Sequence, residues 1–578
     1  MRDTDEEEME YEDNSTDLDV RDAVIKQVWD RNFDNDNNDS LLFGTPQSNI
    51  DLHTLHPDQV QIFRLWQIYL DNVNPLLKVT HTPTLQPRVI DGAANVANID
   101  SSLEALMFSI YCVSILSLSD EECHTMFGTE KAIALASYQF ACRHALQNCE
   151  FLRSGNRDCL TALFLYLISA RPGTDPRSLS SMLAVAIRIA HRMGIHNEAS
   201  NAKCASVEAE MRRRLWWSVV MFDNRVCEMF DYKTATLAPT WDCKLPLNIN
   251  DSELRTEMKN PPVTLHDNLP TESIFIVLRS EVADFTRHSA FHLDFTNPSL
   301  KTIHLPKDTE HRRIREDSYD ELIALESTIE KRYLTYCNPE NPLHFMTIYS
   351  IRSALAKCQL LEHYYNQYSL SSSKQNPEEE DISYALIMLE SDTKLMSVPL
   401  AKGYIWYTIF HFPLPAYIHI LQGLRKQPMM AGAGHAWEVM STNLQIRTNV
   451  KRENRPLFVF FARMVLQTWR AREALWMEQG TPIEQQTVPW MVEDIRNKVA
   501  QMRINFPHTD DNNSANEQPG TSMSIDDFLM PMDISGGQIS FTAGSSWSYP
   551  DMPVQAAMQI DMNQLDWTTI DWNTFRGW

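Results

Sequence analysis

Residues Glu208–Phe230, EAEMRRRLWWSVVMFDNRVCEMF, place three arginines and two tryptophans ahead of a lone aspartate in an otherwise apolar run. At the α-helical step of about 100° per residue, Asp223 points to the middle of a broad apolar arc, between Val219 and Val226. The arc is formed by Leu215, Trp216, Val219, Val220, Phe222, Val226, Cys227, Met229 and Phe230. The opposite side of the helix holds polar side chains, namely Arg214, Ser218, Asn224, Arg225 and Glu228. The stretch therefore predicts a long helix with a buried apolar face.

The predicted position of Asp223 requires a partner, because an ionised carboxylate in an apolar interior is costly unless it is paired. Arg212 points in the same direction, but it lies three turns earlier, about 16 Å along the axis at 1.5 Å per residue. We therefore expect a donor from another helix, either an arginine or a tryptophan indole N–H. A catalytic carboxylate is the alternative interpretation, but no second carboxylate, histidine or metal-ligand spacing accompanies Asp223.

The arginine run in the same stretch has two interpretations. In the structural one, Arg213 lies over Trp217 at the i+4 position, a contact worth about 0.5–1 kcal/mol at an exposed site. In the other, three consecutive basic residues bind phosphate or direct nuclear import. We favour the structural interpretation, in which the helix signature consists of Arg212, Arg213, Arg214, Trp216, Trp217 and Asp223.

Helical periodicity also marks the chain ahead of this stretch. PDQVQIFRLWQIYLDNVNPLL, residues 57–77, places one apolar face at helical spacing, formed by Ile62, Leu65, Trp66, Tyr69 and Val73. We expect Pro75 to end this helix and HTPTL, residues 81–85, to follow as an extended turn. PRSLSSMLAVAIRIAHRMGIH, residues 176–196, predicts a helix that Gly194 ends.

The remainder of the body alternates between helical patterns and polar or proline-rich breaks. Residues 100–119, DSSLEALMFSIYCVSILSLS, are nearly all apolar and predict a buried helix with a capping signal at Asp100. Residues 234–251, TATLAPTWDCKLPLNIND, predict a loop. Later helices are predicted at 270–290, 315–337, 343–370, 382–396, 401–424, 434–447, 456–478 and near 488–503. No strand-period stretch competes with these patterns, so the body is predicted to be all-α.

Charge is concentrated at the two ends of the 578-residue chain, whose formal net charge is −25. Residues 1–40 hold fifteen acidic and four basic residues, a net charge of −11, and residues 510–578 hold ten acidic and one basic, a net charge of −9. The residues between them therefore carry only −5. An acidic surface does not by itself attract a phosphate backbone.

Other sequence features exclude several protein classes. The N-terminus, MRDTDEEEMEYEDNSTD, has no apolar run of the kind a signal peptide needs, and no stretch of eighteen apolar residues predicts a membrane span. The ten cysteines include no C-x2-C pair, which favours buried thiols in a reducing compartment. No glycine-rich phosphate loop, H-E-x-x-H or G-x-S-x-G motif occurs.

Four segments, in order, resemble the middle homology region of fungal-specific transcription factors, a helical domain usually found behind a binuclear zinc cluster. They are FRLWQIYLDNVNPLLKVTHTPTL (63–85), AVAIRIAHRMGIHNE (184–198), EMRRRLWWSVVMFDNRVCEMF (210–230) and DCKLPLNIND (242–251). The third matches the family's Arg–Arg–x–x–Trp–Trp…Asp signature. The resemblance covers about residues 60–255, and the helical remainder to about 506 fits the family's longer domain.

The chain departs from the family pattern in two places. DYKTATLAP, residues 231–239, stands where the family often has Gly–Arg–Pro. The zinc cluster needs six cysteine thiolates in two groups, but the first cysteine here is Cys112, within a predicted core helix. We therefore expect no cofactor: zinc is typical of the family, but this chain has no ligand set for it. DNA contact would require a partner or a zinc cluster absent from this chain.

The C-terminal segment combines acidic and aromatic residues in MSIDDFLMPMDISGG and MNQLDWTTIDWNTFRGW. Neighbouring acids keep aromatics solvated and available to a partner's groove, as in activation domains that fold against a coactivator. The candidate activation residues are Asp526, Asp527, Phe528, Leu529, Trp567, Trp572, Phe575 and Trp578. A tail that docks its tryptophans on its own body, or one without a role, is the alternative.

Together these features predict four regions: a disordered acidic tail (1–56), a regulatory core (57–260), its helical continuation (261–506) and a disordered acidic-aromatic tail (507–578). The resemblance implies a nuclear transcriptional regulator of fungal metabolic or biosynthetic genes that is not an enzyme. Its expected partners are coactivators and a second chain in a homo- or heterodimer, with no membrane. The alternatives are a helical inhibitor that dimerises with zinc-cluster regulators without binding DNA, and an all-α enzyme.

Overall fold

A computed structural model describes residues 51–229, 237, 240–256, 269–288, 309–369, 382–448, 455–479 and 487–504. Throughout these ranges the regular elements are helices and no strand occurs, so the all-α prediction is confirmed. The acidic stretches 1–50 and 505–578 lie outside the described residues. The folded body begins slightly before residue 57, because Leu52–Leu55 forms a 3-10 turn (η1) with Leu52 buried.

The helices follow one another with short connections. In order they are α3 (Gln59–Ile68), the π-helical η2 (Tyr69–Val73), α4 (Asn74–Leu77), α5 (Thr82–Ala94), η3 (Val96–Asn98), α6 (Ser101–Ser117), α7 (Asp120–Phe127), α8 (Lys131–Asn148), α9 (Arg157–Ala170), η4 (Arg171–Gly173), α10 (Pro176–Arg192), α11 (Glu198–Asn201), α12 (Ser206–Met229), η6 (Asp251–Glu253), α13 (Ile274–His288), α16 (Thr309–Arg332), η7 (Leu334–Tyr336), α17 (Pro342–Ser369), α18 (Ser383–Ser397), η8 (Pro399–Tyr404), α19 (Ile405–Phe410), α20 (Leu414–Lys426), α21 (Ala433–Thr448), α22 (Arg455–Gln479) and α23 (Trp490–Ile504).

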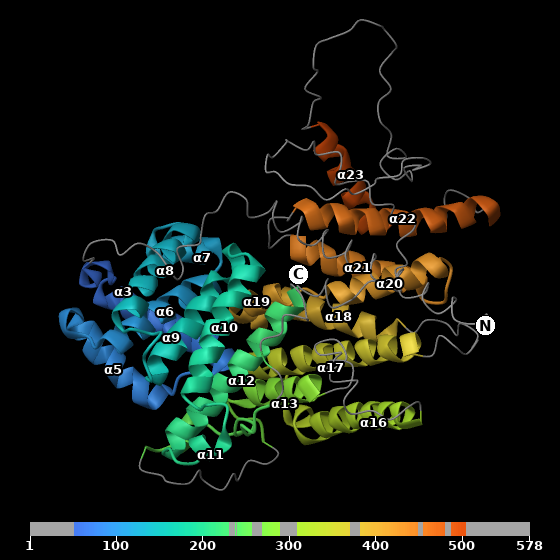
Figure 1. The fold of residues 1–578 in the computed structure, drawn as a ribbon. Coiled ribbons are helices and arrows are strands. Elements are labelled where there is room, and N and C mark those ends of the chain that lie inside the picture. The colour runs from blue at the N-terminus through green and yellow to red at the C-terminus, as the bar shows by residue number, and fades with distance from the viewer. Residues whose placement is uncertain are drawn as a thin grey trace, which may run out of the picture. The chain divides into compact units, whose positions relative to one another are not determined.

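The chain divides into two compact units. Of the described residues, the larger unit holds 51–417 and 442–448, and the smaller holds 418–441 and 455–504. The core of the larger unit is built around α6, where every residue from Leu103 to Ser117 is buried. Asp100 caps α6 by accepting from the backbone N–H groups of Ser102 and Leu103. Helix α6 packs against both α8 and α9, which Figure 1 shows in blue and teal.

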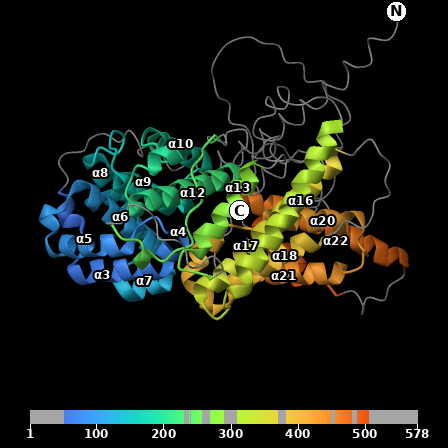
Figure 2. The same cartoon turned by 90° about the horizontal axis from the view of Figure 1, so that it is seen from below.

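Helix α12 joins two helix clusters within the larger unit. It packs against α10 and α9 on one side and against α13 on the other, and α13 in turn packs against α17. Figure 2 shows α12 and α13 following each other between α10 and α17. The long helix predicted from residues 208–230 is therefore the element on which the two clusters meet.

Two expectations about proline near the first helix are wrong. Pro75 does not end the helix, because it lies in the first turn of α4, where its missing N–H is not needed after the π-helical turn η2. The helical run instead ends at Lys78, which has a left-handed φ of 49°. HTPTL is not an extended turn either: α5 begins at Thr82, with Pro83 in its first turn.

The predicted end of α10 is confirmed. The helix finishes at Arg192, and Gly194 adopts a φ of 69°, the left-handed conformation that glycine tolerates. The N–H of Ile195 donates to the carbonyl of Ala190 at 3.2 Å, which closes the helix end. A Cβ at Gly194 would also lie only 3.1 Å from the Ser200 hydroxyl.

The single helix predicted at 401–424 is wrong, because the chain breaks there. A 3-10 segment, η8, leads into the short helix α19, which stops at Phe410, and α20 begins at Leu414. Pro413 explains the break, since it has no backbone N–H to continue the helical ladder, and Pro415 lies in the first turn of the new helix, where its missing N–H is tolerated. His411 and Phe412 therefore lie in an irregular segment between two helices.

The smaller unit has an aromatic core of its own. The rings of Trp437 and Trp469 meet edge to face at 5.2 Å, and those of Trp469 and Trp476 at 5.3 Å. Helices α22 and α23 pack together, and Arg496 on α23 forms a salt bridge with Glu473 on α22 at 3.0 Å.

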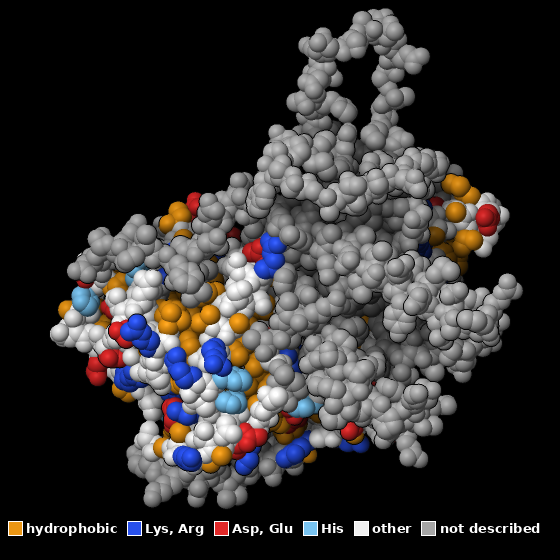
Figure 3. Space-filling view, viewed as in Figure 1, with side chains coloured by type: hydrophobic (Ala, Val, Ile, Leu, Met, Phe, Trp, Pro, Cys, Tyr) orange, Lys and Arg blue, Asp and Glu red, His pale blue; other side chains and the backbone are white. Residues whose placement is uncertain are grey.

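The surface of the body mixes charges of both signs. On the face shown in Figure 3, basic side chains over α9 and α10 are interspersed with acidic and apolar ones. Among the helices that the structure describes, none combines the length and the apolar character needed to cross a bilayer.

Candidate functional site

The signature helix α12 is tied to the rest of the body by buried ion pairs. Arg214 is fully buried, and its Nε donates to Glu210 at 2.9 Å while its Nη1 donates to Asp251 at 2.6 Å. Glu210 is also fully buried and accepts the backbone N–H of Leu247 at 3.0 Å. One arginine of the run therefore fixes both its own helix and the loop that contains Leu247 and Asp251.

The same network reaches back to the first helices. Lys78 is 1% exposed, and its Nζ lies 3.1 Å from Asp251 and 3.0 Å from Glu272. His81 contributes through Nε2, which lies 2.9 Å from the backbone carbonyl of Asp251. Burial would raise the pKa of Asp251, but Arg214 and Lys78 outweigh it and hold that pKa below its ordinary value. Asp251 is therefore an ionised carboxylate shared by two cations.

Arg213 has a different partner from the one predicted. Its guanidinium forms a salt bridge with Glu198, which also accepts the backbone N–H of Lys244 at 3.2 Å. The Trp217 indole donates to the carbonyl of Lys244 at 2.9 Å. Arg213 and Trp217 thus hold the same loop through different groups, rather than stacking on each other as the structural interpretation had it.

Asp223 was predicted to meet a donor from another helix, either an arginine or a tryptophan N–H, and the structure shows an arginine there. Nη2 of Arg287 on α13 donates to Asp223 at 2.6 Å, and both side chains are nearly inaccessible to solvent, at 0% and 2% exposed. Nη1 of Arg287 donates to the carbonyl of Leu237 at 3.0 Å. The pair joins α12 to α13, which is a structural role.

The polar side of α12 is not a solvent face as its composition suggests. Arg214 is 0%, Ser218 3% and Arg225 5% exposed. Helical periodicity assigns these residues to the outside, but α12 lies between two helix clusters, so its polar side is also covered. The Ser218 hydroxyl, for example, donates to the carbonyl of Leu77 at 3.4 Å.

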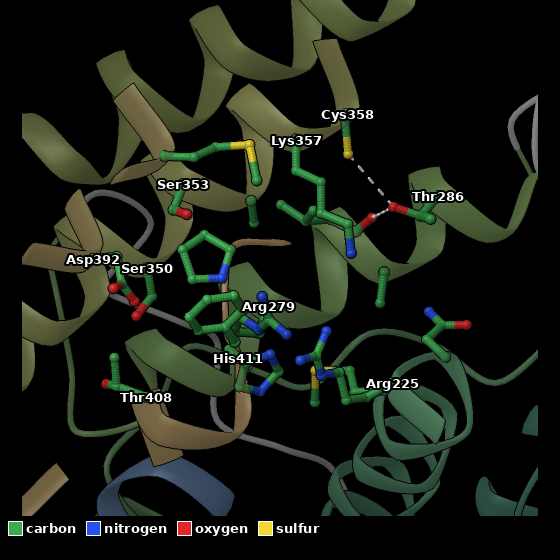
Figure 4. A pocket seen from close by; sticks show the side chains of 18 of the residues that line it. Arg225, Arg279, Thr286, Ser350, Ser353, Lys357, Cys358, Asp392, Thr408 and His411 are labelled. Atoms are coloured by element: carbon green, nitrogen blue, oxygen red, sulfur yellow. Dashed lines mark hydrogen bonds between the residues drawn. The ribbon is translucent and has the colours of Figure 1, made fainter. Parts of the chain in front are cut away.

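A pocket opens where α12 meets α13, α17, α18 and α19, and it has a volume of about 1090 Å³ including space open to solvent. Three cationic side chains line it: Arg225 from α12, Arg279 from α13 and Lys357 from α17. Figure 4 shows them pointing toward one shared space. The break between α19 and α20 supplies another wall through His411, Phe412, Pro413 and Pro415.

The guanidinium of Arg225 is fixed by the backbone at the end of α19. Its Nη2 and Nε donate to the carbonyl of Phe410, at 2.5 and 3.1 Å, at the C-terminal end of α19. Its guanidinium lies 5.2 Å from the centre of the Phe410 ring, and that of Arg171 lies 3.2 Å from the same ring. Two cations therefore share one aromatic side chain beside the pocket.

The pocket is electropositive around His411. Burial, and after it the charges of Arg225, Arg279, Arg171 and Lys357, lower the pKa of this imidazole well below its ordinary value. His411 is therefore neutral at pH 7, and its ring packs against Tyr407 at 4.7 Å.

The predicted residues thus separate into two groups. Arg212, Arg213, Arg214, Trp216, Trp217 and Asp223 lie together on α12, and Asp223 does not line the pocket. The candidate activation residues, Asp526 to Trp578, lie outside the described residues. Sequence reasoning missed Arg279, Lys357 and His411, because each stands alone in an apolar helix or proline-rich stretch and only the fold brings them together.

Cysteine and metal chemistry add little to the site. The cysteines whose side chains are described form no disulfide. Within the same part of the chain, no group of three or more histidine, cysteine or acidic side chains is arranged to hold a metal ion.

Comparison with known proteins places this chain in a family. The profile of the fungal specific transcription factor domain matches residues 66–386. The chain is 52% identical to "Transcriptional regulator AacuB" of Aspergillus aculeatus over 96% of this chain and 76% of the relative. It is 45% identical to "Transcriptional regulator nsrM" of Aspergillus novofumigatus over 98% and 78% of the two chains. "Aurofusarin cluster transcription factor aurR2" of Gibberella zeae is 28% identical over 72% and 61%.

The structure also accounts for the four segments on which the resemblance rests. Lys78 and His81, Glu198, the α12 arginines, and Asp251 come from the four segments in turn, and they meet in one ion-pair network around α12. In this chain, the segments that resemble the family therefore contribute to one buried scaffold. The chain belongs to the fungal-specific transcription factor family, whose members regulate transcription.

Proposed function

We propose that this chain regulates the transcription of a set of biosynthetic genes in a fungal nucleus. The observation that carries the proposal is the family match over residues 66–386, together with a relative named as a transcriptional regulator over 96% of this chain. Other relatives are named as transcription factors of the aurofusarin cluster and of the pyriculol/pyriculariol biosynthesis cluster. A helical inhibitor is not favoured, because these relatives are named as regulators themselves.

In this proposal the helical body is a regulatory domain without catalytic activity, extending over the predicted regions 57–260 and 261–506. Asp223, the carboxylate that could have suggested an enzyme, is 2% exposed and bound by Arg287. A buried, paired carboxylate has neither the accessibility nor the unperturbed lone pairs that general base catalysis needs. These contacts support a structural role for the signature residues.

The acidic-aromatic segment is proposed to activate transcription by recruiting a coactivator. Ten acidic residues and one basic residue in 510–578 surround Phe528, Trp567, Trp572 and Trp578. Aromatic side chains kept in water by neighbouring acids are available to a hydrophobic groove on a partner.

Deleting the gene tests the regulatory role. We expect transcripts of a co-located set of biosynthetic genes to fall in the deletion strain and to recover when the full chain is restored. Transcript levels that are unchanged across the genome would contradict the proposal. A fluorescently tagged full chain should accumulate in the nucleus, and a cytoplasmic signal under inducing conditions would count against it.

Fusing residues 508–578 to a neutral DNA-binding module tests the activation segment. We expect reporter expression, and we expect the Trp567→Ala, Trp572→Ala variant to lose most of it. A matched control replaces two polar residues of the same segment, Asn563→Ala and Thr569→Ala, and should retain activity. Equal loss in both variants would indicate that composition, rather than the aromatic side chains, is what matters.

The mode of DNA contact is proposed to be indirect. A protein that neutralises phosphates shows an affinity that falls steeply with salt. The purified chain alone is therefore expected to show no salt-dependent binding to promoter DNA, and binding should appear only with a partner chain. Light scattering of the purified chain would show whether that partner can be a second copy.

A further inference from the structure

Two cysteines lie together where α8 ends and α9 begins. Cys149 follows the last residue of α8 as its C-cap, and Cys159 is the third residue of α9. Sγ of Cys159 lies 4.0 Å from the carbonyl oxygen of Cys149, and the two side chains also interact directly, thiol to thiol. The S–H of Cys149 can donate either to Cys159 or to the carbonyl of Leu146, which lies 3.3 Å from its Sγ. The fold therefore brings two thiols into contact across a short connection.

The surroundings of Cys159 favour its ionised form. A hydrogen bond from Cys149, helped by the hydroxyls of Ser154 and Ser102, lowers the pKa of Cys159 below its ordinary value and outweighs burial, which would raise it. Cys159 also lies in the first turn of the 14-residue helix α9, where unpaired backbone N–H groups and the helix dipole favour a thiolate. The contact with Cys159, and after it burial, raises the pKa of Cys149. The pair therefore favours one thiolate beside one thiol.

The two hydroxyls beside Cys159 are fixed by other parts of the turn. The side-chain amide of Asn156, the N-cap of α9, donates to the Ser102 hydroxyl at 3.0 Å. The Ser154 hydroxyl accepts the backbone N–H of Asn156 at 3.0 Å. Arg192 on α10 donates to the backbone carbonyl of Ser154 at 2.9 Å, which ties the turn to a further helix. The environment of the sulfur is therefore part of the folded structure and does not depend on the cysteines alone.

Access distinguishes this pair from a second pair of cysteines. Cys112 on α6 and Cys142 on α8 also interact thiol to thiol, but both are 0% exposed in the core. Thiols buried in apolar surroundings are generally inert. Cys149 is partly exposed, and Cys159 beside it is 1% exposed. A small oxidant can therefore reach the pair at Cys149, which is also the side chain in contact with the thiolate.

We propose that Cys149 and Cys159 are a peroxide-sensitive dithiol, which oxidises to a disulfide that joins the end of α8 to the start of α9. The Cys159 thiolate attacks one oxygen of hydrogen peroxide, which gives a sulfenic acid and releases hydroxide. The Cys149 sulfur then attacks the sulfenic sulfur: the S–S bond forms, the S–O bond breaks, and the departing hydroxide leaves as water with the thiol proton. The two sulfurs lose two electrons and the peroxide gains them.

The disulfide and its effect on transcription are separate claims. Formation of the disulfide depends only on the geometry of the turn between α8 and α9 and is independent of the proposed function. Regulation of the body by oxidation rests on that function. In a reducing compartment the resting state is the dithiol, and cysteine pairs of this kind are typically transient and redox-sensing there.

The test uses the purified, reduced full chain and hydrogen peroxide. Samples taken during oxidation are blocked with N-ethylmaleimide, digested with trypsin and analysed by mass spectrometry. Trypsin cleaves between the two cysteines, so the disulfide joins peptides 144–153 and 158–177. We expect this crosslink to form about tenfold faster than peroxide consumes the thiol of Cys204, because the pair contains a thiolate. No crosslink at a peroxide dose that consumes Cys204 would overturn the proposal.

Matched variants test the surroundings of the pair. Cys204 is partly exposed like Cys149, and its Sγ lies 3.8 Å from the carbonyl of Ser200. Cys204→Ser should leave the rate of crosslinking within twofold of the wild-type rate. Ser102→Ala keeps both thiols but removes one hydroxyl beside the thiolate, so it should slow crosslinking severalfold. The neighbouring Ser101→Ala is its control, and equal rates in these two variants would contradict the assignment of Cys159 as the attacking thiolate.

The unfolded wild-type chain provides a control that does not depend on a variant's folding. In sequence, Cys149 is closer to Cys142 than to Cys159, and a shorter loop generally costs less entropy to close. In guanidinium chloride, peroxide should therefore link peptide 144–153 to peptide 132–143 at least as often as to peptide 158–177. In the folded chain that product should be at least tenfold rarer, because Cys142 is 0% exposed. The same products in the same ratio from both states would overturn the proposal.

The regulatory consequence has its own readout. In the cell, Cys149→Ser should abolish the response of target transcripts to peroxide and leave their level without peroxide unchanged. If the crosslink forms in the purified chain but the wild type and the variant respond alike, the dithiol is oxidised without regulating transcription. If gene deletion changes no transcripts while the crosslink forms as expected, the proposed function fails and the disulfide stands.

Discussion

Two arginines on α12, three turns apart, are both buried but occupy different electrostatic surroundings. Arg214 is fully buried between two carboxylates, those of Glu210 and Asp251. Arg225 is 5% exposed, donates to the carbonyl of Phe410 and faces a pocket that also holds Arg279 and Lys357. Burial alone therefore does not tell a scaffold arginine from a ligand-facing one.

The largest loss of stability is expected when a buried ion pair is broken. Arg287→Ala leaves Asp223 buried without its salt-bridge partner, and removing one partner of a buried pair typically costs about 3–5 kcal/mol. We expect a loss of this size in the free energy of opening of α12. Native-state hydrogen exchange of α12 peptides measures it locally, without assuming that the two units unfold together.

A double variant separates the pair from the packing around it. Asp223→Leu, Arg287→Met removes both charges and should recover much of the stability that Arg287→Ala loses. The Arg352→Ala variant, which removes half of an exposed pair with Glu330, should change α12 by less than about 0.5 kcal/mol. If the double variant is as unstable as the single one, lost packing rather than an unpaired charge explains the effect.

The second effect concerns the carboxylate shared by Lys78 and Arg214. Asp251→Asn leaves two buried cations with less compensation, and we expect a cost of about 2–4 kcal/mol at pH 7. Because the pKa of Asp251 is lowered in the folded state, its contribution is present above the unfolded pKa of about 3.9 and is lost as the pH falls through the folded value.

The pH dependence checks the sign of that contribution. Unfolding followed from pH 7 to pH 2 should show wild type and Asp251→Asn differing most above pH 4 and converging at lower pH. Asp71→Asn, at an exposed residue of η2, is the control and should leave the profile nearly unchanged. A stability gap that widens on acidification would contradict the ionised, two-cation environment of Asp251.

Much of the scaffold could be predicted from the sequence, because it depends on local helical periodicity. Helical spacing predicts the apolar face of the first helix, the buried α6 and the end of α10 at Gly194. The cost of a buried charge predicts that Asp223 meets a donor from another helix, though not whether that donor is an arginine or a tryptophan. Pro75 and Pro83 were misread because proline is compatible with the first turn of a helix, so its presence does not by itself mark a break.

The pocket could not be predicted from the sequence, because its residues come together only in the folded structure. Pro413 does break the helix, between α19 and α20, and the segment around it forms one wall of the pocket. Its cations come from positions 225, 279 and 357, and each on its own resembles an ordinary helical residue. The electropositive character arises only from their convergence in space, which no local pattern encodes.

In the third prediction the substitution is not expected to reduce stability, unlike the first two. Arg279→Met removes one of several like charges and replaces it with an apolar side chain beside three methionines. We expect the stability of α13 to be unchanged or to rise by up to about 1 kcal/mol. Arg279 is half-buried and its Nε has no hydrogen-bond partner within the described part of the chain, and replacing an incompletely compensated charge with an apolar residue is often neutral or stabilising. Hydrogen exchange of α13 peptides measures it.

The same variant should raise the pKa of His411. Arg279 is one of the charges that lower it, so its removal favours the protonated imidazole. An NMR pH titration of His411 would detect the shift, and Arg352→Met on α17 should produce none. A large loss of α13 stability in Arg279→Met would show that this arginine belongs to the scaffold, and the contrast with Arg214 would disappear.

The smallest effect is expected at the first arginine of the run. Nε of Arg212 donates to Glu208 at 2.9 Å in an i,i+4 pair, and both side chains are partly exposed, at 19% and 34%. Glu208 also accepts from Nε of Arg157 at 2.9 Å, so it keeps a partner when Arg212 is removed. Arg212→Ala should therefore cost about 0.3–0.5 kcal/mol, against several kcal/mol for the neighbouring Arg214. If hydrogen exchange of α12 shows comparable losses for the two variants, burial between two carboxylates does not set the contribution of an arginine in this run to stability.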